Sequence, residues 1–318
     1  MDFEDFKNEL MDLVSEEIND RGLEDISLKY TTIDSPDGVT ERLMVSVGDS
    51  KMSMAFRAKD IFNDVQNGES IDDAVRKIVN TIEENVSVIK TKEADVKSFV
   101  TDYEKVKDHT YLRLIPGDSP ILKDTPHRKF EDMEVVVNIH LDSFSDANGK
   151  SVVVVSKPLM EMYGIDEEQL FEDAERNSLA NEPMVFTPLG DMIKHLIEND
   201  EVPSPEEMGI VTYIASNKSG FQGAAVAAYP GFLKKAAETI GGSFYMLPSS
   251  VHEFILIKDD GTPKAKDLNA MVKNVNETVL EAKDFLSDQC YHYDAKARVF
   301  ETGLKYAEKV KQKKGGVR

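Results

Sequence analysis

The sequence predicts an α+β fold, in which a mixed, largely antiparallel sheet is flanked by helices and a smaller helix-plus-hairpin unit comes first. Two observations predict it. Segments with apolar residues at helical spacing are interspersed with short segments of period two. The short segments come in pairs joined by turn residues, and hairpins of this kind are typical of α+β proteins rather than of regular strand–helix–strand arrays.

The first third of the chain predicts helices around one hairpin. Its elements are a helix over 1–21, a strand over 26–33, a hairpin over 41–56, and helices over 58–66, 70–89 and 92–107. Gly22 ends the first helix, and Gly48 with Asp49 supplies the hairpin turn. Ser70 is a good N-cap because Asp73 follows it three residues later.

From residue 111 the sequence becomes rich in strands. The predicted strands cover 111–115, 133–141, 151–156, 184–187 and 210–215, the helices cover 157–163, 166–179, 188–199 and 264–282, and a terminal hairpin covers 291–300. Residues 146–150 form the turn between the second and third strands. The run of four valines in the third strand predicts burial on both faces.

The segment from residue 223 to 257 carries the most consistent local signals of the chain. A proline and glycine at 230–231 begin a helix that Gly241 ends. We expect Phe244–Leu247 and Phe254–Ile257 to be neighbouring central strands, with Pro248–Ser250 as the tight link between them, because both faces of each strand are apolar.

These elements predict three parts in the chain. Residues 1–108 form the N-terminal unit, residues 109–304 form a larger α+β domain, and residues 305–318 form a basic C-terminal tail with six cations and one acid. The stretch 200–208, with two prolines, is the most linker-like in the sequence. We expect limited proteolysis near 105–112 or 200–208.

The charge balance bears on the kind of partner. The chain has 318 residues and a net charge of −21. Such acidity argues against nucleic acid as a partner and against docking on an anionic membrane. Another protein is the expected partner, with the oligomeric state left open.

Cysteine usage and the N-terminus predict a cytoplasmic protein. Cys290 is the only cysteine, so no intrachain disulfide forms. The N-terminus is acidic and amphipathic, unlike a signal peptide, and the apolar runs are too short to cross a bilayer.

Several motifs resemble one uncharacterised family of bacterial proteins. They include PHRKFEDMEVVVNIHLD and NKSGFQGAAVAAYPGFLKKAAETIGGSFYMLPSSVHEFILI, and the resemblance spans most of residues 110–295. The family is of unknown function and occurs mainly in anaerobic Gram-positive bacteria; the order of elements is similar, more distantly, to the YtpQ-like family. The resemblance implies a bacterial cytosolic origin and an α+β fold, and it supplies no catalytic residue.

The best candidate site is a polar island between two apolar strands, formed by Ser249, Ser250, His252 and Glu253. A serine held near an oriented histidine is the arrangement of nucleophilic catalysis. In an extended strand Ser250 and His252 point the same way and Glu253 points opposite, so a local triad is excluded. The alternative is a structural role, because Pro, Ser and Ser are residues that commonly form turns.

Other candidates carry weaker signals. His127 and Arg128 begin a strand and are suited to an anion, or else pair with Glu131 or Asp132. The six histidines form no HExxH pattern, and the glycines at 220–223 and 241–242 match no phosphate-binding loop, so neither a metal nor a cofactor is predicted. Cys290 is expected to be a buried free thiol.

Two functional hypotheses follow. The first is a non-enzymatic binding or regulatory module that acts through protein contacts, because no catalytic motif stands out. The alternative is an unrecognised enzyme, such as a hydrolase that uses His252 with Ser249 or Ser250, or an enzyme that places His127 and Arg128 on an anionic substrate.

Overall fold

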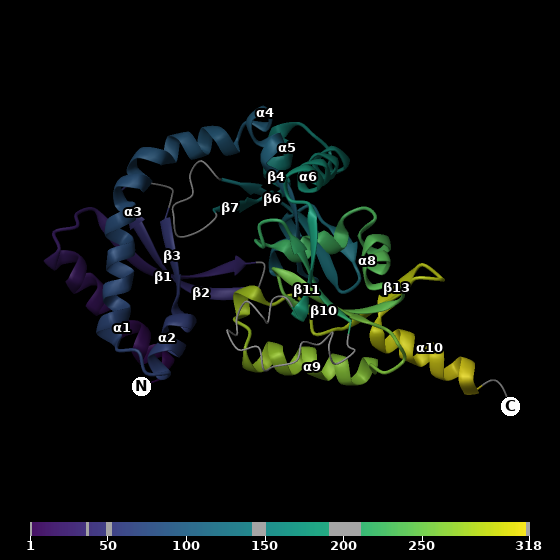
Figure 1. Cartoon of the computed structure of the whole chain (residues 1–318). Helices are drawn as coiled ribbons and strands as arrows, with labels where there is room; N and C mark the ends of the chain where they lie inside the picture. The colour runs from purple at the N-terminus through teal and green to yellow at the C-terminus, as the bar shows by residue number, and fades with distance from the viewer. Residues whose placement is uncertain (1, 36–37, 49–52, 142–150, 191–210, 316–318) are drawn as a thin grey trace. The chain divides into compact units, whose positions relative to one another are not determined.

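The computed structural model describes residues 2–35, 38–48, 53–141, 151–190 and 211–315. The chain has an α+β fold and divides into two compact units, Met1–Tyr103 and Glu104–Arg318 (Figure 1). All strand pairs among the described residues are antiparallel, so the expected mixture of parallel and antiparallel pairing is not seen there.

The first unit combines a three-stranded sheet with three long helices. The elements are α1 (Phe3–Asp20), β1 (Ile26–Ser35), β2 (Gly38–Val47), β3 (Ser53–Arg57), α2 (Ala58–Gln66) and α3 (Ile71–Val100). The short α4 (Tyr103–Val106) begins at the last residue of this unit and continues into the second. The strands follow the order β1-β2-β3, so the strand predicted over 26–33 pairs with the predicted hairpin.

The core of this unit comes from the helical spacing of α1. Phe6, Leu10, Val14 and Ile18 recur every four residues, lie on one face, and are fully or almost fully buried. They pack with one valine of β2 and with four aliphatic side chains of α3. The amphipathic pattern that predicted this helix is therefore also what holds the unit together.

The prediction of a separate helix over 92–107 is wrong. Helix α3 instead runs without interruption for 30 residues from Ile71 to Val100. Its sequence contains no glycine or proline, so nothing in the backbone chemistry breaks the helix near residue 90. Ser70 caps it as predicted, with its hydroxyl accepting from the Asp73 N–H at 3.1 Å.

The second unit contains two sheets. In the first, β6 (Met133–His140) is central: it pairs with β4 (Thr110–Pro116) on one side and with β5 (Arg128–Phe130) and β7 (Val152–Val154) on the other. Helix α6 (Glu167–Asn181), preceded by α5 (Lys157–Tyr163), packs on β4.

The prediction that the four-valine run is buried holds only for Val155, which is fully buried and follows β7. All eight residues of β6 are buried, whereas Val152, Val153 and Val154 are half-buried because β7 pairs only with β6 among the described strands. Burial depends on a strand's neighbours, and a run of valines does not specify them.

The second sheet has six strands in the order β13-β12-β10-β11-β9-β8. Their bounds are β8 (Met184–Pro188), β9 (Thr212–Asn217), β10 (Phe244–Ser250), β11 (Glu253–Lys258), β12 (Tyr291–Asp294) and β13 (Val299–Thr302). As predicted, β10 and β11 are central neighbours and β12 with β13 is a hairpin.

The link between β10 and β11 differs from the prediction. Pro248 and Ser250 belong to β10, which carries a bulge between them, and the turn is made by Val251 and His252. The proline is tolerated because the bulge interrupts the regular ladder at that point.

Helices surround the six-stranded sheet (Figure 1). They are η4 (Gly223–Ala228), α8 (Phe232–Ile240), α9 (Ala265–Thr278) and α10 (Gly303–Gly315). Gly231 and Gly241 begin and end α8 in left-handed conformations, as the sequence predicts. One face of β10 packs with α9 through Tyr245, Leu247 and Leu268.

Helix α10 holds most of the segment predicted as a basic tail. It packs on the α9 cluster through Tyr306 and Ala307. Most of the helix predicted over 188–199, the turn at 146–150 and the linker at 200–208 lie outside the described residues. Among the helices of the described part, none is long and apolar enough to cross a membrane.

Candidate functional site

The turn formed by Val251 and His252, here called the His252 turn, lies at the end of the two central strands. Three hydrogen bonds from other segments of the chain fix its backbone. The Val251 N–H donates to the Asp284 carbonyl at 2.8 Å, the Ala224 N–H donates to the Val251 carbonyl at 3.2 Å, and the Ser216 hydroxyl donates to the His252 carbonyl at 2.8 Å. Segments distant in sequence thus hold the turn in one conformation.

The His252 ring is engaged at both nitrogens. Its Nδ1 accepts from the Gln222 N–H at 3.1 Å and lies 3.2 Å from the Gly220 carbonyl. Its Nε2 lies 3.4 Å from an oxygen of Asp284, and the side chain is 38% exposed.

The loop that meets this ring is conformationally strained. Gln222 has φ +51°, in the left-handed region that non-glycine residues rarely adopt. Gly223 follows, and a Cβ there would lie 2.0 Å from the Ser216 hydroxyl and 2.6 Å from the His252 carbonyl. Only glycine therefore fits between β9 and the His252 turn.

The contact extends into the first sheet of the same unit. The fully buried Asn138 of β6 donates through Nδ2 to the Gln222 side-chain oxygen at 2.8 Å. Its own Oδ1 is buried and has no partner among the described residues. The strained glutamine thus links β6 to the His252 turn.

Ser250, one of the serines predicted beside His252, bonds through its hydroxyl to the backbone of His252 and not to its ring. The Ser250 hydroxyl accepts from the His252 backbone N–H at 3.0 Å, which is ordinary turn chemistry. Ser249 and Glu253 are half-buried at the facing ends of β10 and β11. Ser250, His252 and Glu253 are therefore neighbours at the turn. Ser250 does not make the hydrogen bond to the histidine ring that a catalytic serine would need.

The other predicted pair belongs to the first sheet. His127 Nδ1 lies 2.8 Å from the Thr125 carbonyl, and the Arg128 guanidinium lies over the Phe171 ring at 4.3 Å from its centroid. Asp132, one of the expected partners, instead accepts hydrogen bonds from Ser287 and Tyr291. The structure does not join His127 or Arg128 to the His252 turn.

Sequence reasoning missed a second histidine site, here called the His292 pair, formed by His292 of β12 and Asp259 at the end of β11. His292 Nε2 lies 2.9 Å from an Asp259 oxygen. The Tyr306 ring of α10 stacks on the imidazole at 3.5 Å between centroids, and its hydroxyl donates to the same carboxylate at 3.4 Å. Asp259 is separated from His292 by 33 residues and from Tyr306 by 47, and no local pattern signals the contact.

The His292 imidazole is enclosed. Its side chain is 1% exposed, and Nδ1 is buried without a hydrogen-bond partner among the described residues. Burial lowers the pKa of His292, against the opposing effect of Asp259. The ring is therefore neutral at pH 7, and no nitrogen is placed to exchange a proton with a substrate outside.

Cys290 lies beneath the same region. The thiol is fully buried and donates to the Ala265 carbonyl at 3.4 Å. Burial raises its pKa to about 11, which leaves almost no thiolate at neutral pH. A cysteine nucleophile is thus disfavoured at this position.

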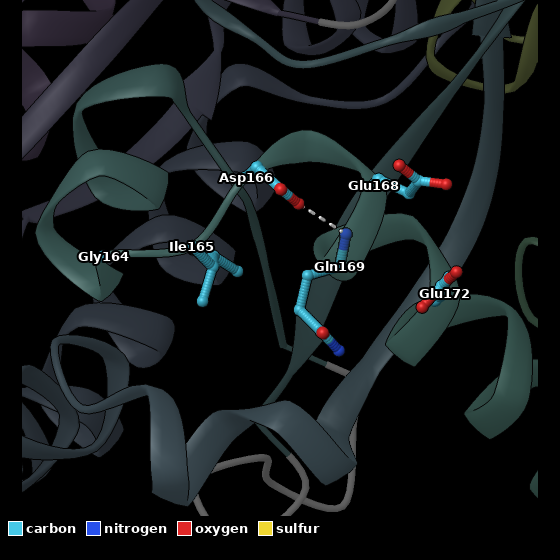
Figure 2. Close-up of a pocket in the computed structure, with 6 residues that line it drawn as sticks. All are labelled: Gly164, Ile165, Asp166, Glu168, Gln169 and Glu172. Carbon is cyan, nitrogen blue, oxygen red and sulfur yellow. Dashed lines mark hydrogen bonds between the residues drawn. The ribbon is translucent and has the colours of Figure 1, made fainter.

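A cleft of about 640 Å³ opens beside the His292 pair, between α10 and the start of α9. Tyr245, Asp259 and Tyr306 form its inner wall. A second hollow, of about 400 Å³, lies at the start of α6 and is shown in Figure 2. Its Asp166 accepts from the Gln169 N–H at 2.9 Å, so this carboxylate caps the helix.

The described residues contain no group of three or more histidine, cysteine, aspartate or glutamate side chains suited to a metal ion. His195 lies outside them.

Comparison with known proteins places the chain in a family. A family model described as a family of unknown function, DUF5688, matches residues 3–295. The chain belongs to this family. The matched range includes the His252 turn and His292, and it ends before β13 and α10. Searches of curated proteins and of solved structures returned no match.

Proposed function

We propose that the chain is a non-enzymatic binding module of the bacterial cytoplasm that acts through contacts with another protein. The observation that carries this proposal is an apolar stripe on α9, formed by Met271, Val275 and Val279 at the helix end. These side chains are 56%, 37% and 77% exposed. Exposed apolar groups that lie together on one face are a common mark of a protein interface.

The spacing of the stripe suits a helical partner. Met271 and Val275 are four residues apart and lie on one side of α9, next to the buried Leu268 and Val272, and Val279 follows at the C-cap of the helix. The apolar face of α9 is thus wider than the part that its own core covers. A second amphipathic helix that packs along this ridge would complete it.

Charge favours a different protein over a second copy. The chain carries a net charge of −21, so two copies repel each other. A partner helix with basic residues beside its apolar face would gain from the same field. By the same argument, we expect no binding to nucleic acid or to an anionic membrane.

The hydrolase alternative has less support. It requires the Ser250 or Ser249 hydroxyl at the His252 ring, yet Ser250 Oγ accepts from the backbone N–H of His252 at 3.0 Å. The ring itself is held by Gln222 and Asp284. These contacts favour a structural role for His252. The origin in anaerobic Gram-positive bacteria and the YtpQ-like similarity stay predictions.

Site-specific photo-cross-linking in the native host tests the proposal. A photoreactive residue at Val275 should give one heterologous protein adduct, with the cross-linked peptide mapping to an amphipathic basic helix. Met162 of α5, which is 63% exposed, is the matched control position. Met271→Asp with Val279→Asp should abolish the adduct while the protein stays folded.

Three outcomes would contradict the proposal. They are an adduct only with a second copy of the chain, the same adducts from position 162, and an adduct that survives the double substitution. Light scattering on the purified protein separates the first from the others, because self-association shows directly in the molar mass.

A further inference from the structure

The cleft beside the His292 pair combines aromatic walls with lysines. The half-buried Tyr306 forms one side next to Tyr245, which is only 4% exposed, and Ala307 with Val310 continues that side along α10. Its volume, about 640 Å³, falls in the range that holds small organic ligands. Rings that line such a space stack on planar groups.

Among the residues that the structure describes, the lysine side chains of the cleft have no bonded protein partner. Lys264, Lys266 and Lys311 line it, and all three are exposed. Within the described residues none of them makes an ion pair or a side-chain hydrogen bond. By contrast, Lys309 on the same helix pairs with the buried Glu301 at 2.5 Å. The cleft therefore presents ammonium groups that remain available to a ligand.

The main acid of the cleft is already satisfied. One Asp259 oxygen accepts from the Gly261 N–H at 3.0 Å, and the other accepts from His292 at 2.9 Å and from Tyr306 at 3.4 Å. Asp267 is the other acid of the lining and is exposed. The lining of the cleft therefore contains three lysines and two acids, and one of those acids, Asp259, is already hydrogen-bonded within the protein. This local excess of positive charge contrasts with the net charge of −21 of the whole chain.

We propose that this cleft binds a small organic anion with a planar apolar body. The planar part lies against the half-buried Tyr306 ring and the neighbouring Ala307 and Val310, and the anionic group is held by Lys264 and Lys266. Charge-assisted hydrogen bonds from ammonium groups supply the selectivity for an anion. This site goes beyond the proposed function, because it uses no residue of the α9 stripe.

The probe for the test is 8-anilinonaphthalene-1-sulfonate, a planar aromatic anion that fluoresces when its rings leave water. N-phenyl-1-naphthylamine, which has the same ring systems without the sulfonate, is the neutral control. The full-length native protein should bind the sulfonate at least tenfold more tightly than the neutral dye, since only the anion gains the lysine contacts.

Variants locate the binding. Lys264→Glu with Lys266→Glu should raise the dissociation constant of the sulfonate at least tenfold. Lys296→Glu, an exposed lysine of the β12–β13 turn, is the matched control and should leave it unchanged. Ala307→Trp should abolish binding of both dyes by filling the cleft. The lysine variants change exposed residues only, so they remain informative if Ala307→Trp does not fold.

Each of four results overturns the proposal: no binding of the sulfonate, equal binding of the neutral dye, an equal effect of Lys296→Glu, and loss of binding in Met271→Asp with Val279→Asp. The last result would place the dye on the α9 stripe. It would leave the proposed protein contact standing, so the two proposals fail separately.

Discussion

The His252 turn and the His292 pair both place a histidine beside an aspartate, yet they hold the ring by different means. His252 is fixed by backbone groups around a turn, and its side chain is 38% exposed. His292 is 1% exposed and is fixed by the Asp259 carboxylate and the Tyr306 ring. The turn is thus a junction of strained backbone, whereas the pair is part of a packed core.

This difference predicts that the two histidines contribute unequally to stability. His292→Ala removes a buried ring and leaves Asp259 without its main side-chain donor, so the free energy of unfolding should fall by about 4 kcal/mol. Urea unfolding followed by circular dichroism measures it. A fall below about 1 kcal/mol would show that the stacked arrangement carries little of the stability.

Two glycines sharpen the comparison. Gly223→Ala should lower the free energy of unfolding by about 3 kcal/mol, because the new Cβ meets the backbone carbonyl of His252 as well as a side chain. Adding Ser216→Ala should not restore stability, because the new Cβ would still clash with the backbone carbonyl of His252. Rescue by that second change would mean that the turn is free to shift.

A glycine-to-alanine change at Gly303, which lies against Cys290 near the His292 pair, should behave differently. A Cβ at Gly303 would lie 2.6 Å from the Cys290 sulfur, a side-chain atom, and 3.3 Å from the Ala265 Cβ. We expect Gly303→Ala to cost about 2 kcal/mol and Cys290→Ala to recover most of that loss in the double variant. The same urea titration measures both, and an additive loss would contradict this assignment.

His252→Ala should have a smaller effect, a loss of about 1–2 kcal/mol in the free energy of unfolding, because the ring is partly solvated and water replaces its hydrogen bonds. Thermal unfolding of the variant beside His292→Ala ranks the two directly. A larger loss at residue 252 than at residue 292 would reverse the comparison.

The pH dependence of stability provides the finest distinction. Burial lowers the pKa of His292 below its ordinary value of 6.5, so the unfolded chain takes up the proton first as the pH falls. Stability therefore rises with pH in the window below 6.5 and is lost on acidification. Urea midpoints at pH 7.5 and 6.0 should differ more for the native protein than for His292→Gln. Equal differences would refute the assignment.

Much of the fold could be predicted from local patterns. The stripe Phe6, Leu10, Val14 and Ile18 identifies α1, and the glycines at 231 and 241 mark the bounds of α8. The exposure of β7 could not be predicted, because it depends on which strands pair. A run of valines looks the same in sequence at an edge as in the centre of a sheet, and the three valines of β7 are half-buried.

Of the two candidate sites, one has a local signal in the sequence and the other has none. The polar residues that mark the His252 turn stand out because they interrupt two apolar strands, although the bulge and the partners Gln222 and Asp284 could not be read locally. The His292 pair gives no local signal. Asp259, His292 and Tyr306 look like unremarkable surface residues in sequence and meet only through sheet register and the packing of α10.

The central claim is that the chain acts through the α9 stripe and that the His252 turn is structural. The yield of the cross-link from position 275, measured in a His252→Ala background at a temperature where that variant is fully folded, tests it most directly. We predict an unchanged yield of the heterologous adduct. A yield that falls severalfold in the folded variant would contradict the claim, because it would place the binding surface at the His252 turn.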